Sequence, residues 1–307
     1  MDAPAPAASA PAPTGVARTV WELTKPGITR MVLVTTAVGF AMGAPGRTWT
    51  LPEFLFVFLA CLVGTAFSSA GANALNMWLE RDRDALMART AKRPIPSGRL
   101  APNHALAVGL FCSVLGPCLL CAWTTPAAAI VAFATIVTYV CIYTPSKPIT
   151  TLSTIIGAFP GALPPLIGFT AAVPVAESFQ WLAVPAGWTL FAIMFVWQIP
   201  HFLAIAWMYK DDYAAGGHRV LAAEDPTGAR TARYSLTWLA VLLPVSLLPI
   251  VAMPDLLGWP YGIAAIALGL LFAWTGVRFA AEPTRPRAVK MFLASIAHLP
   301  LRFLAMV

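Results

Sequence analysis

Apolar segments of about 20 residues, separated by short polar stretches, follow one another along the chain from residue 28 onward. An α-helix of that length crosses the hydrocarbon core of a bilayer, and the segments break at glycines, prolines and clusters of charge. The pattern therefore predicts an all-α, polytopic membrane bundle of about nine transmembrane helices. They are expected at residues 28–44, 52–76, 103–122, 125–143, 152–172, 180–207, 234–253, 258–278 and 288–306. The sixth begins later if Pro185 and Gly187 interrupt it.

The composition agrees with this interpretation. Hydrophobic residues make up 59% of the 307 positions and charged residues only 11%, whereas soluble domains carry about 25% charged residues. The five cysteines lie in apolar segments, so we expect no disulfide framework. The N-terminal segment is rich in Pro and Ala and lacks both a basic start and an apolar core. We predict a disordered tail over residues 1–20, not a signal peptide, and a single transmembrane domain over residues 21–307.

The basic residues indicate an orientation. Eighteen of the 20 Lys and Arg residues fall on one side of the predicted spans, and only Arg47 and Arg302 fall on the other. By the positive-inside rule, the N-terminus and the loops of the basic side are cytoplasmic. We expect a multi-pass protein of the bacterial inner (plasma) membrane with its active site facing the cytoplasm. The net charge of +7 needs no nucleic acid to explain it, although an anionic substrate would benefit from it.

The second predicted span ends in a cluster of charge, NMWLERDRD. If the helix continues, its turn of about 100° per residue places Asn76, Glu80 and Asp84 within an arc of about 80°. Asp82 points elsewhere and is expected to pair with a neighbouring Arg. A line of oxygen ligands suits Mg²⁺, which combines one or two protein carboxylates with substrate phosphates. The alternative is a charged helix end that only anchors the span at the membrane surface.

Basic residues follow this acidic face at Arg89, Lys92 and Arg93. They are candidates for binding phosphate oxygens, with Arg in bidentate geometry. Carboxylates and cations at the edge of a bilayer together favour an isoprenyl diphosphate as substrate. Its lipid tail would lie in the bilayer, and its charged head would lie at the cytoplasmic edge.

A second acidic cluster follows the sixth span, where the apolar segment leads into Lys210, Asp211 and Asp212. On a continuous helix, Gln198, His201 and Asp212 would share a face. Two acidic clusters that end helices on the same side favour a two-metal clamp on one diphosphate. Polar residues inside membrane spans are functional candidates. His201 nevertheless fits an interhelical hydrogen bond as well as it fits acceptor binding or proton transfer.

The remaining histidines carry weaker signals. His298 lies in the last predicted span, where a packing role is favoured over a chemical one. His104 and His218 lie in predicted loops without a neighbouring motif that indicates chemistry.

Four segments resemble the UbiA-type intramembrane prenyltransferases, and within that family the branch that modifies heme. They are NMWLERDRDALMARTAKRPIPSGR, YTPSKPIT, STIIGAFPGALPPLIGFTA and FVWQIPHFLAIAWMYKDDYAAGG. The first matches the family pattern NxxxDxxxD, with Glu80 in the middle position. ALPPLIG and WQIPHF are more specific to the heme branch. The resemblance covers roughly residues 22 to 290.

The resemblance implies a helical bundle around a central cavity that opens sideways to lipid. It also implies a Mg²⁺-dependent reaction of farnesyl diphosphate with heme b that yields heme O and diphosphate. A heme-processing or terminal oxidase assembly partner would be compatible with that role. The resulting candidates are Asn76, Glu80, Asp84, Asp211 and Asp212 for catalysis and metal; Arg89, Lys92, Arg93, Tyr143, Lys147 and Lys210 for diphosphate; and Gln198 and His201 for the acceptor. Which of the two adjacent aspartates holds metal stays open.

The chain departs from the family pattern at three places. Ser146-Lys147-Pro148 stands where a Leu-Lys-Arg run is common, so one expected cation is missing. Ser153 stands where Asn is common, and His218-Arg219-Val220 stands where Phe-Pro-Met is common. Arg219 is a candidate to replace the missing charge.

In the implied reaction, basic residues stabilise the diphosphate as it leaves farnesyl C1. The vinyl group attacks the allylic cation, and water completes the product. Aromatic faces can stabilise that cation, and the candidates are Trp78, Tyr143, Trp197 and Tyr213. Two alternatives remain. The first is another aromatic acceptor, such as a quinone precursor or a chlorophyll-type ring, which ALPPLIG and WQIPHF disfavour. The second is a transporter, which the position of the acids at one membrane face, away from the midplane, disfavours.

Overall fold

A computed structural model describes residues 15–306, and within this range the protein is entirely helical, with no strand. The elements are α1 (Val16–Leu23), α2 (Pro26–Gly43), η1 (Ala44–Gly46), α3 (Leu51–Leu79), α4 (Arg81–Asp84), α5 (Pro102–Trp123), α6 (Pro126–Val137), η2 (Thr138–Tyr143), α7 (Thr144–Ser146), α8 (Ser153–Ala162), α9 (Pro164–Ala171), η3 (Val175–Glu177), α10 (Ser178–Ala183), α11 (Pro185–Met208), α12 (Lys210–Ala215), α13 (Ala229–Val245), α14 (Leu248–Ala252), α15 (Trp259–Ala281) and α16 (Arg285–Leu304).

Eight of the helical segments between residues 15 and 306 are long and apolar enough to cross a membrane. They are Pro26–Gly46, Leu51–Leu79, Pro102–Trp123, Pro126–Ser146, Ser153–Ala171, Pro185–Met208, Ala229–Ala252 and Trp259–Ala281. The ninth predicted span corresponds to α16, a helix of 20 residues that is less apolar and packs along α15 and α11. The prediction of an all-α, multi-pass membrane protein is therefore confirmed.

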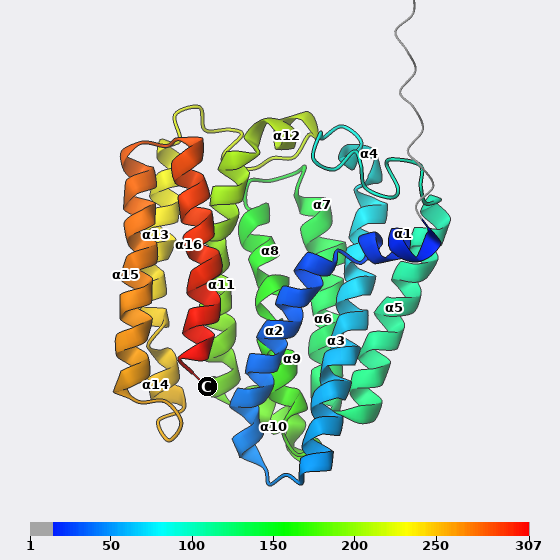
Figure 1. Ribbon diagram of the computed structural model, residues 1–307, viewed down its shortest axis with the longest axis vertical. Coiled ribbons are helices and arrows are strands. Elements are labelled where there is room, and N and C mark those ends of the chain that lie inside the picture. The colour runs from blue at the N-terminus through cyan, green and yellow to red at the C-terminus, as the bar shows by residue number, and fades with distance from the viewer. Residues whose placement is uncertain (1–14, 307) are drawn as a thin grey trace, which may run out of the picture.

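The start of the described chain differs from the predicted tail. Residues 1–14 lie outside the described range, but Val16 already begins α1, which lies across the end of the bundle (Figure 1). Leu23 at the end of α1 is buried with Met77 of α3 and Ile95. The predicted boundary at residue 20 is therefore too late, because a short amphipathic helix is hard to recognise beside a Pro/Ala-rich segment.

The helices approach each other closely where glycines face a neighbouring backbone. A Cβ atom on Gly39 of α2 would lie 1.9 Å from the Pro165 carbonyl oxygen of α9. A Cβ atom on Gly168 of α9 would lie 1.9 Å from the Thr36 carbonyl oxygen of α2. Small residues drive helix association in lipid because they allow such backbone contact. This contact fixes α2 against α9. It thereby also positions Lys25, the residue that precedes α2.

Four of the predicted spans are interrupted, and the seventh of them divides into α13 and α14. The fifth breaks at Leu163 into α8 and α9, because Pro164 and Pro165 follow. The sixth starts at Pro185 after the short α10, as the Pro and Gly in its sequence indicated. The fourth ends in the π-helix η2. Single π-helical turns are frequent at functional sites, and this one carries Tyr143.

Figure 1 shows the consequence of this topology. The helices α13, α15 and α16 lie at one flank, α3 and α5 lie at the other, and α2 runs between the two groups. The connections from α3 to α5, from α7 to α8 and from α11 to α13 meet at one end of the bundle, where α4 and α12 lie. The predicted acidic and basic clusters are therefore brought to the same end.

Candidate active site

The predicted acidic face is present at the end of α3. The backbone N–H of Glu80 donates to the Asn76 carbonyl at 3.0 Å, and that of Asp84 donates to the Glu80 carbonyl at 2.8 Å. The three residues are thus one turn apart, although α3 ends at Leu79 and α4 begins after Glu80. Their exposed fractions are 0%, 5% and 0%, in chain order. A charged helix end that only anchors a span would be exposed, so this burial favours a functional face.

Asp82 behaves differently from its neighbours, as the helical spacing predicted. Its side chain is 87% exposed and pairs with Arg81 Nε at 3.7 Å. The alternation of buried and exposed acids within NMWLERDRD therefore follows the helical turn.

Two cations hold the buried carboxylates. Lys147 Nζ lies 2.6 Å from Glu80 Oε1, and Arg93 Nη1 donates to Asp84 Oδ2 at 2.6 Å. Burial by itself raises the pKa of Glu80, but the charges of Lys147 and Lys25 outweigh it and the net pKa is lowered. Burial by itself lowers the pKa of Lys147. Tyr143 and Glu80 act in the opposite direction, and the net pKa is raised. Both members of the pair are therefore charged at neutral pH.

Lys25 also lies in the candidate site, although its sequence context did not single it out. Its Nζ donates to Asn76 Oδ1 at 2.5 Å, and Asn76 Nδ2 donates to Thr144 Oγ1 at 2.9 Å. Lys25 has left-handed backbone angles (φ 48°, ψ 67°) and is the only non-glycine residue with positive φ between residues 15 and 306. Such strained conformations cluster at functional sites. A lysine just before a span reads as a membrane anchor, so no sequence signal separated Lys25 from the other flanking cations.

The environment of Lys25 also weakens its charge. Burial, supported by the nearby charge of Arg93, lowers the pKa of Lys25 to about 7, although Glu80 and Asp84 act in the opposite direction. The ammonium group is therefore poised to gain or lose its proton near neutral pH, and an anionic ligand beside it would favour the charged form.

The oxygen atoms of the acidic face fit a hard divalent cation. Asp84 Oδ1 is buried and accepts no hydrogen bond from the part of the chain that the structure describes. Carboxylate and amide oxygens are the ligands that Mg²⁺ prefers. Over residues 15–306, no group of three or more His, Cys, Asp and Glu side chains is placed to hold a metal by itself. Phosphate oxygens would have to complete the shell, as is usual for Mg²⁺.

The second acidic cluster is placed differently from the prediction. α11 ends at Met208, because Tyr209 leaves the helical conformation (φ −126°, ψ 27°), and the separate α12 lies across the end of the bundle (Figure 1). The predicted continuous face that joins Gln198 and His201 to Asp212 is therefore wrong. Asp211 is exposed, and Asp212 is half-buried.

Arg89 connects the two clusters. Its guanidinium lies over the rings of Tyr209 and Tyr213, at 4.9 and 5.0 Å from their centroids. Burial disfavours the charge of Arg89, but Tyr213 and Asp212 raise its pKa overall. Arg89 thus extends from the loop after the first cluster to the helix that carries the second.

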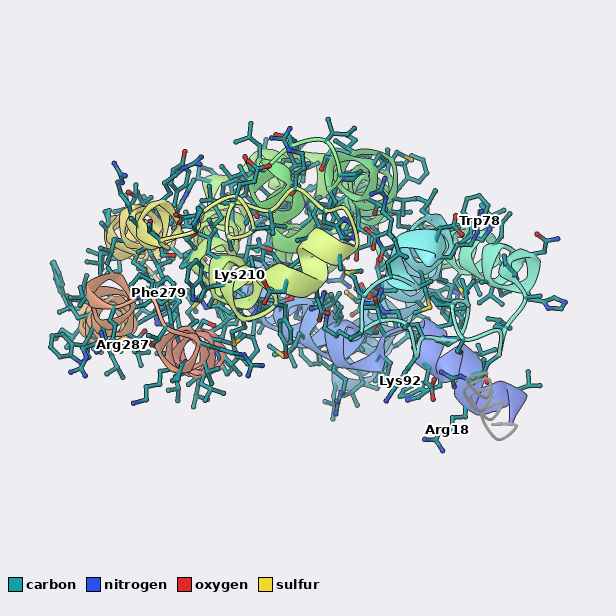
Figure 2. All side chains as sticks on the ribbon, turned by 90° about the horizontal axis from the view of Figure 1, so that it is seen from above. Arg18, Trp78, Lys92, Lys210, Phe279 and Arg287 are labelled. Carbon is teal, nitrogen blue, oxygen red and sulfur yellow. The ribbon has the colours of Figure 1, made fainter. Side chains whose placement is uncertain are left out.

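The other predicted diphosphate ligands are only partly gathered. The Tyr143 ring lies 4.6 Å from Lys147 Nζ, and Gly157 leaves space for that ring, because a Cβ atom there would lie 2.5 Å from it. Lys92 is exposed at the outer edge of the bundle (Figure 2). Lys210 places its ammonium 4.5 Å from the centre of the Trp207 ring. The structure brings Tyr143 to the acidic face and leaves these two lysines outside it.

The predicted acceptor residues take part in helix packing. Gln198 Nε2 donates to the Ala158 carbonyl of α8 at 2.8 Å. His201 Nδ1 lies 2.7 Å from Ser295 Oγ of α16, and its ring is stacked between Trp197 and Phe292, with centroids 5.0 and 5.1 Å away. The hydrogen-bonding role that we considered for His201 is therefore present, and its role toward the acceptor stays a prediction.

The remaining predictions concern an arginine and two tryptophans. The backbone N–H of Arg219 donates to the Lys147 carbonyl at 2.8 Å, but its guanidinium is paired with Glu224 and is 55% exposed. Trp78 packs beside α5 (Figure 2). Trp197 is buried, and its Nε1 donates to the Ser295 carbonyl. These contacts are with Glu224, α5 and Ser295, and none of them is with Asn76, Glu80 or Asp84.

Buried carboxylates and matching cations at one end of a membrane bundle suit an enzyme that acts within the membrane on an anionic substrate. The UbiA prenyltransferase family matches residues 32–296, and the chain belongs to this family. Among similar proteins, the protoheme IX farnesyltransferase of Solibacter usitatus (strain Ellin6076) is 42% identical, over 91% of this chain and 94% of that protein. The mitochondrial protoheme IX farnesyltransferase of Arabidopsis thaliana is 35% identical, over 92% of this chain and 63% of that protein. The resemblance predicted from the four motifs is confirmed.

Solved structures share the fold. A digeranylgeranylglyceryl phosphate synthase superimposes with a TM-score of 0.72 at 17% identity, covering 94% of this chain and 96% of that one. A UbiA homolog from Archaeoglobus fulgidus bound to GPP and Mg²⁺ superimposes with a TM-score of 0.63 at 14% identity, covering 94% and 99%. At these identities the likeness establishes the arrangement of the helices.

Proposed function

We propose that this protein transfers the farnesyl group of farnesyl diphosphate to a vinyl group of heme b, giving heme O and diphosphate. The observation that carries the proposal is 42% identity to a protoheme IX farnesyltransferase over 91% of the chain. The geometry supports it, because Asn76, Glu80 and Asp84 are buried at the end of the bundle and each contacts a lysine or an arginine.

In this proposal the diphosphate head lies against the acidic face, and the farnesyl tail extends into the bundle. Lys25, Arg93 and Lys147 are within reach of phosphate oxygens, because they already contact the residues of that face. Mg²⁺ would be held by Asn76, Glu80 and Asp84, by Asp211 or Asp212, and by the diphosphate itself. When bound, Mg²⁺ supplies positive charge that stabilises the leaving diphosphate.

The reaction breaks the bond between farnesyl C1 and the diphosphate oxygen, and the electron pair leaves with the diphosphate. The π electrons of the vinyl group form the new carbon–carbon bond to C1. Water adds to the remaining cation and releases a proton, which completes the hydroxyethylfarnesyl substituent. Lys147 and Arg93 stabilise the charge that develops on the leaving group, and the face of Tyr143 is available to stabilise the allylic cation.

The acceptor side of the proposal concerns Gln198 and His201. Trp197, His201 and Phe292 form a stack of rings between α11 and α16. Polar residues inside membrane spans are functional candidates. We keep Gln198 and His201 as candidate acceptor-binding residues on this basis.

The proposal includes a location. The cationic loops lie at the same end as the acidic face, and by the positive-inside rule we expect this end and the N-terminus in the cytoplasm. The membrane would be the bacterial inner membrane. A heme-processing or terminal oxidase assembly factor would be a natural recipient of the product.

The decisive experiment supplies the purified protein with heme b, farnesyl diphosphate and Mg²⁺, followed by heme extraction and mass analysis. The expected result is a mass gain of one farnesyl group plus one hydroxyl group, lost in Glu80→Ala and Asp84→Ala variants that still fold. Product from 4-hydroxybenzoate in place of heme b would move the proposal to another acceptor. Intact farnesyl diphosphate after incubation would overturn a transferase activity and favour the transporter alternative.

A further inference from the structure

We propose that His218 is a further binding residue for the diphosphate head group and donates a hydrogen bond from its imidazole to a phosphate oxygen. This inference rests on the function proposed above and extends its diphosphate site. It also reverses an expectation from the sequence, in which His218 was a loop residue without a chemical role.

The turn after α12 directs His218 into the protein. Gly217 has left-handed backbone angles (φ 66°), which glycine adopts at little cost. The N–H of His218 donates to the Tyr213 carbonyl at 2.9 Å, and that of Gly217 donates to the Ala214 carbonyl at 3.0 Å. This pair of bonds is a Schellman motif, which ends the helix and reverses the chain. As a result, His218 is only 5% exposed although it lies in a connecting loop.

The residues on both sides of His218 are attached to the other loops of the site. Arg83, which lies between Glu80 and Asp84 in α4, donates to the carbonyls of Gly216 and Gly217 at 3.3 and 3.2 Å. The N–H of Arg219 donates to the Lys147 carbonyl at 2.8 Å. His218 therefore lies where the loop of the acidic face, the loop of Lys147 and the loop after α12 meet.

The imidazole has an unused polar atom in this position. Nδ1 of His218 is buried and has no hydrogen-bond partner among the described residues. The ring stands edge-on to the Tyr213 ring, 6.0 Å between centroids, and Tyr213 in turn lies under Arg89. A buried polar atom without a partner is costly, and a ligand that pairs with it would remove that cost.

The charges around His218 indicate the ligand. Lys147, Arg83 and Arg89 act on it as cations, and Glu80 acts as an anion. Burial lowers the pKa of His218 to about 4 despite the opposing charge of Glu80, so the ring is neutral at pH 7. A neutral imidazole has one donor and one acceptor nitrogen. It can thus donate to a phosphate oxygen without adding a further positive charge to this group of cations.

Two substitutions test the assignment. His218→Phe keeps an aromatic ring against Tyr213 and removes both nitrogens. His218→Asn places an amide N–H near the position of Nδ1. Binding of inorganic pyrophosphate with Mg²⁺ is measured by calorimetry, and KM is measured separately for farnesyl diphosphate and for heme b.

We expect His218→Phe to weaken pyrophosphate binding by about tenfold, as for the loss of one hydrogen bond to a charged group. KM for farnesyl diphosphate should rise by a similar factor, and KM for heme b should stay within about twofold of wild type. His218→Asn should recover most of the loss. Circular dichroism and thermal unfolding confirm that both variants fold. If the Phe variant does not fold, the Asn variant is compared with His218→Ala instead.

Unchanged pyrophosphate binding in His218→Phe would overturn the inference. Equal losses in the Phe and Asn variants would also overturn it, because they would assign His218 a packing role. A wild-type protein that binds pyrophosphate but forms no farnesylated heme would overturn the proposed acceptor, while the binding comparison would still decide the role of His218.

Discussion

The ion pair between Glu80 and Lys147 allows the physical basis of the site to be measured independently of its activity. The pair joins the end of α3 to the loop after α7, across a gap of more than 60 residues in the chain. Lys147→Met leaves the Glu80 carboxylate buried without its main partner. Glu80→Gln likewise leaves the Lys147 ammonium buried without its carboxylate partner. We expect the losses of stability in the two single variants to add up to more than the loss in the double variant. The reason is that each single variant leaves an uncompensated buried charge.

The magnitude follows from the distance and the burial. The charged atoms are 2.6 Å apart, and their side chains are 17% and 7% exposed for Lys147 and Glu80. Coulomb's law gives about 6 kcal/mol at an effective dielectric constant of about 20 and about 2 kcal/mol in water. Lys25 and Tyr143 compensate part of the loss in either single variant. We therefore expect a coupling free energy of about 2–4 kcal/mol.

The assay is a double-mutant cycle, with free energies of unfolding measured in detergent micelles by circular dichroism. The exposed pair Arg81 and Asp82 serves as the matched control. Its atoms are 3.7 Å apart and its side chains are 34% and 87% exposed, so its coupling should be below about 0.5 kcal/mol. A coupling for Glu80 and Lys147 no larger than that of the control pair would refute the reasoning.

Three further predictions use other parts of the molecule. Asp84→Asn should reduce the initial rate of formation of farnesylated heme by at least about 100-fold. The same rate in Asp82→Asn should stay within about twofold of wild type. Gly39→Leu should lower the melting temperature in detergent or prevent folding, because even a Cβ atom would lie 1.9 Å from a backbone oxygen. Gly27→Ala, with open space around its Cα, should not lower it. Burial opposes the charge of Asp225, but hydrogen bonds from the start of α13 lower its pKa overall. Its stabilisation is therefore complete above about pH 4 and is lost as the pH falls through the folded-state pKa. Asp225→Asn should be less stable at pH 7 and should lose less stability on acidification.

The sequence by itself determined the membrane spans and the first acidic face. Apolar runs identify spans because every helix in lipid must be long and apolar, whatever its neighbours are. The positions of Asn76, Glu80 and Asp84 on one side, and of Asp82 on the other, follow from the turn of a single helix. These features are local, so a pattern in one segment is enough to predict them. The four motifs were specific enough to indicate the family.

The tertiary structure decided which cations and loops complete the site. Lys25 belongs to it because α2 is fixed on α9 and its first residue is held in a left-handed conformation beside Asn76. Asp212 does not continue the face of Gln198, because α11 ends at Met208. His218 is buried because loops distant in sequence hold the residues beside it. Such placements depend on contacts between segments that are far apart in the chain, and the periodicity of a single segment carries no information about them.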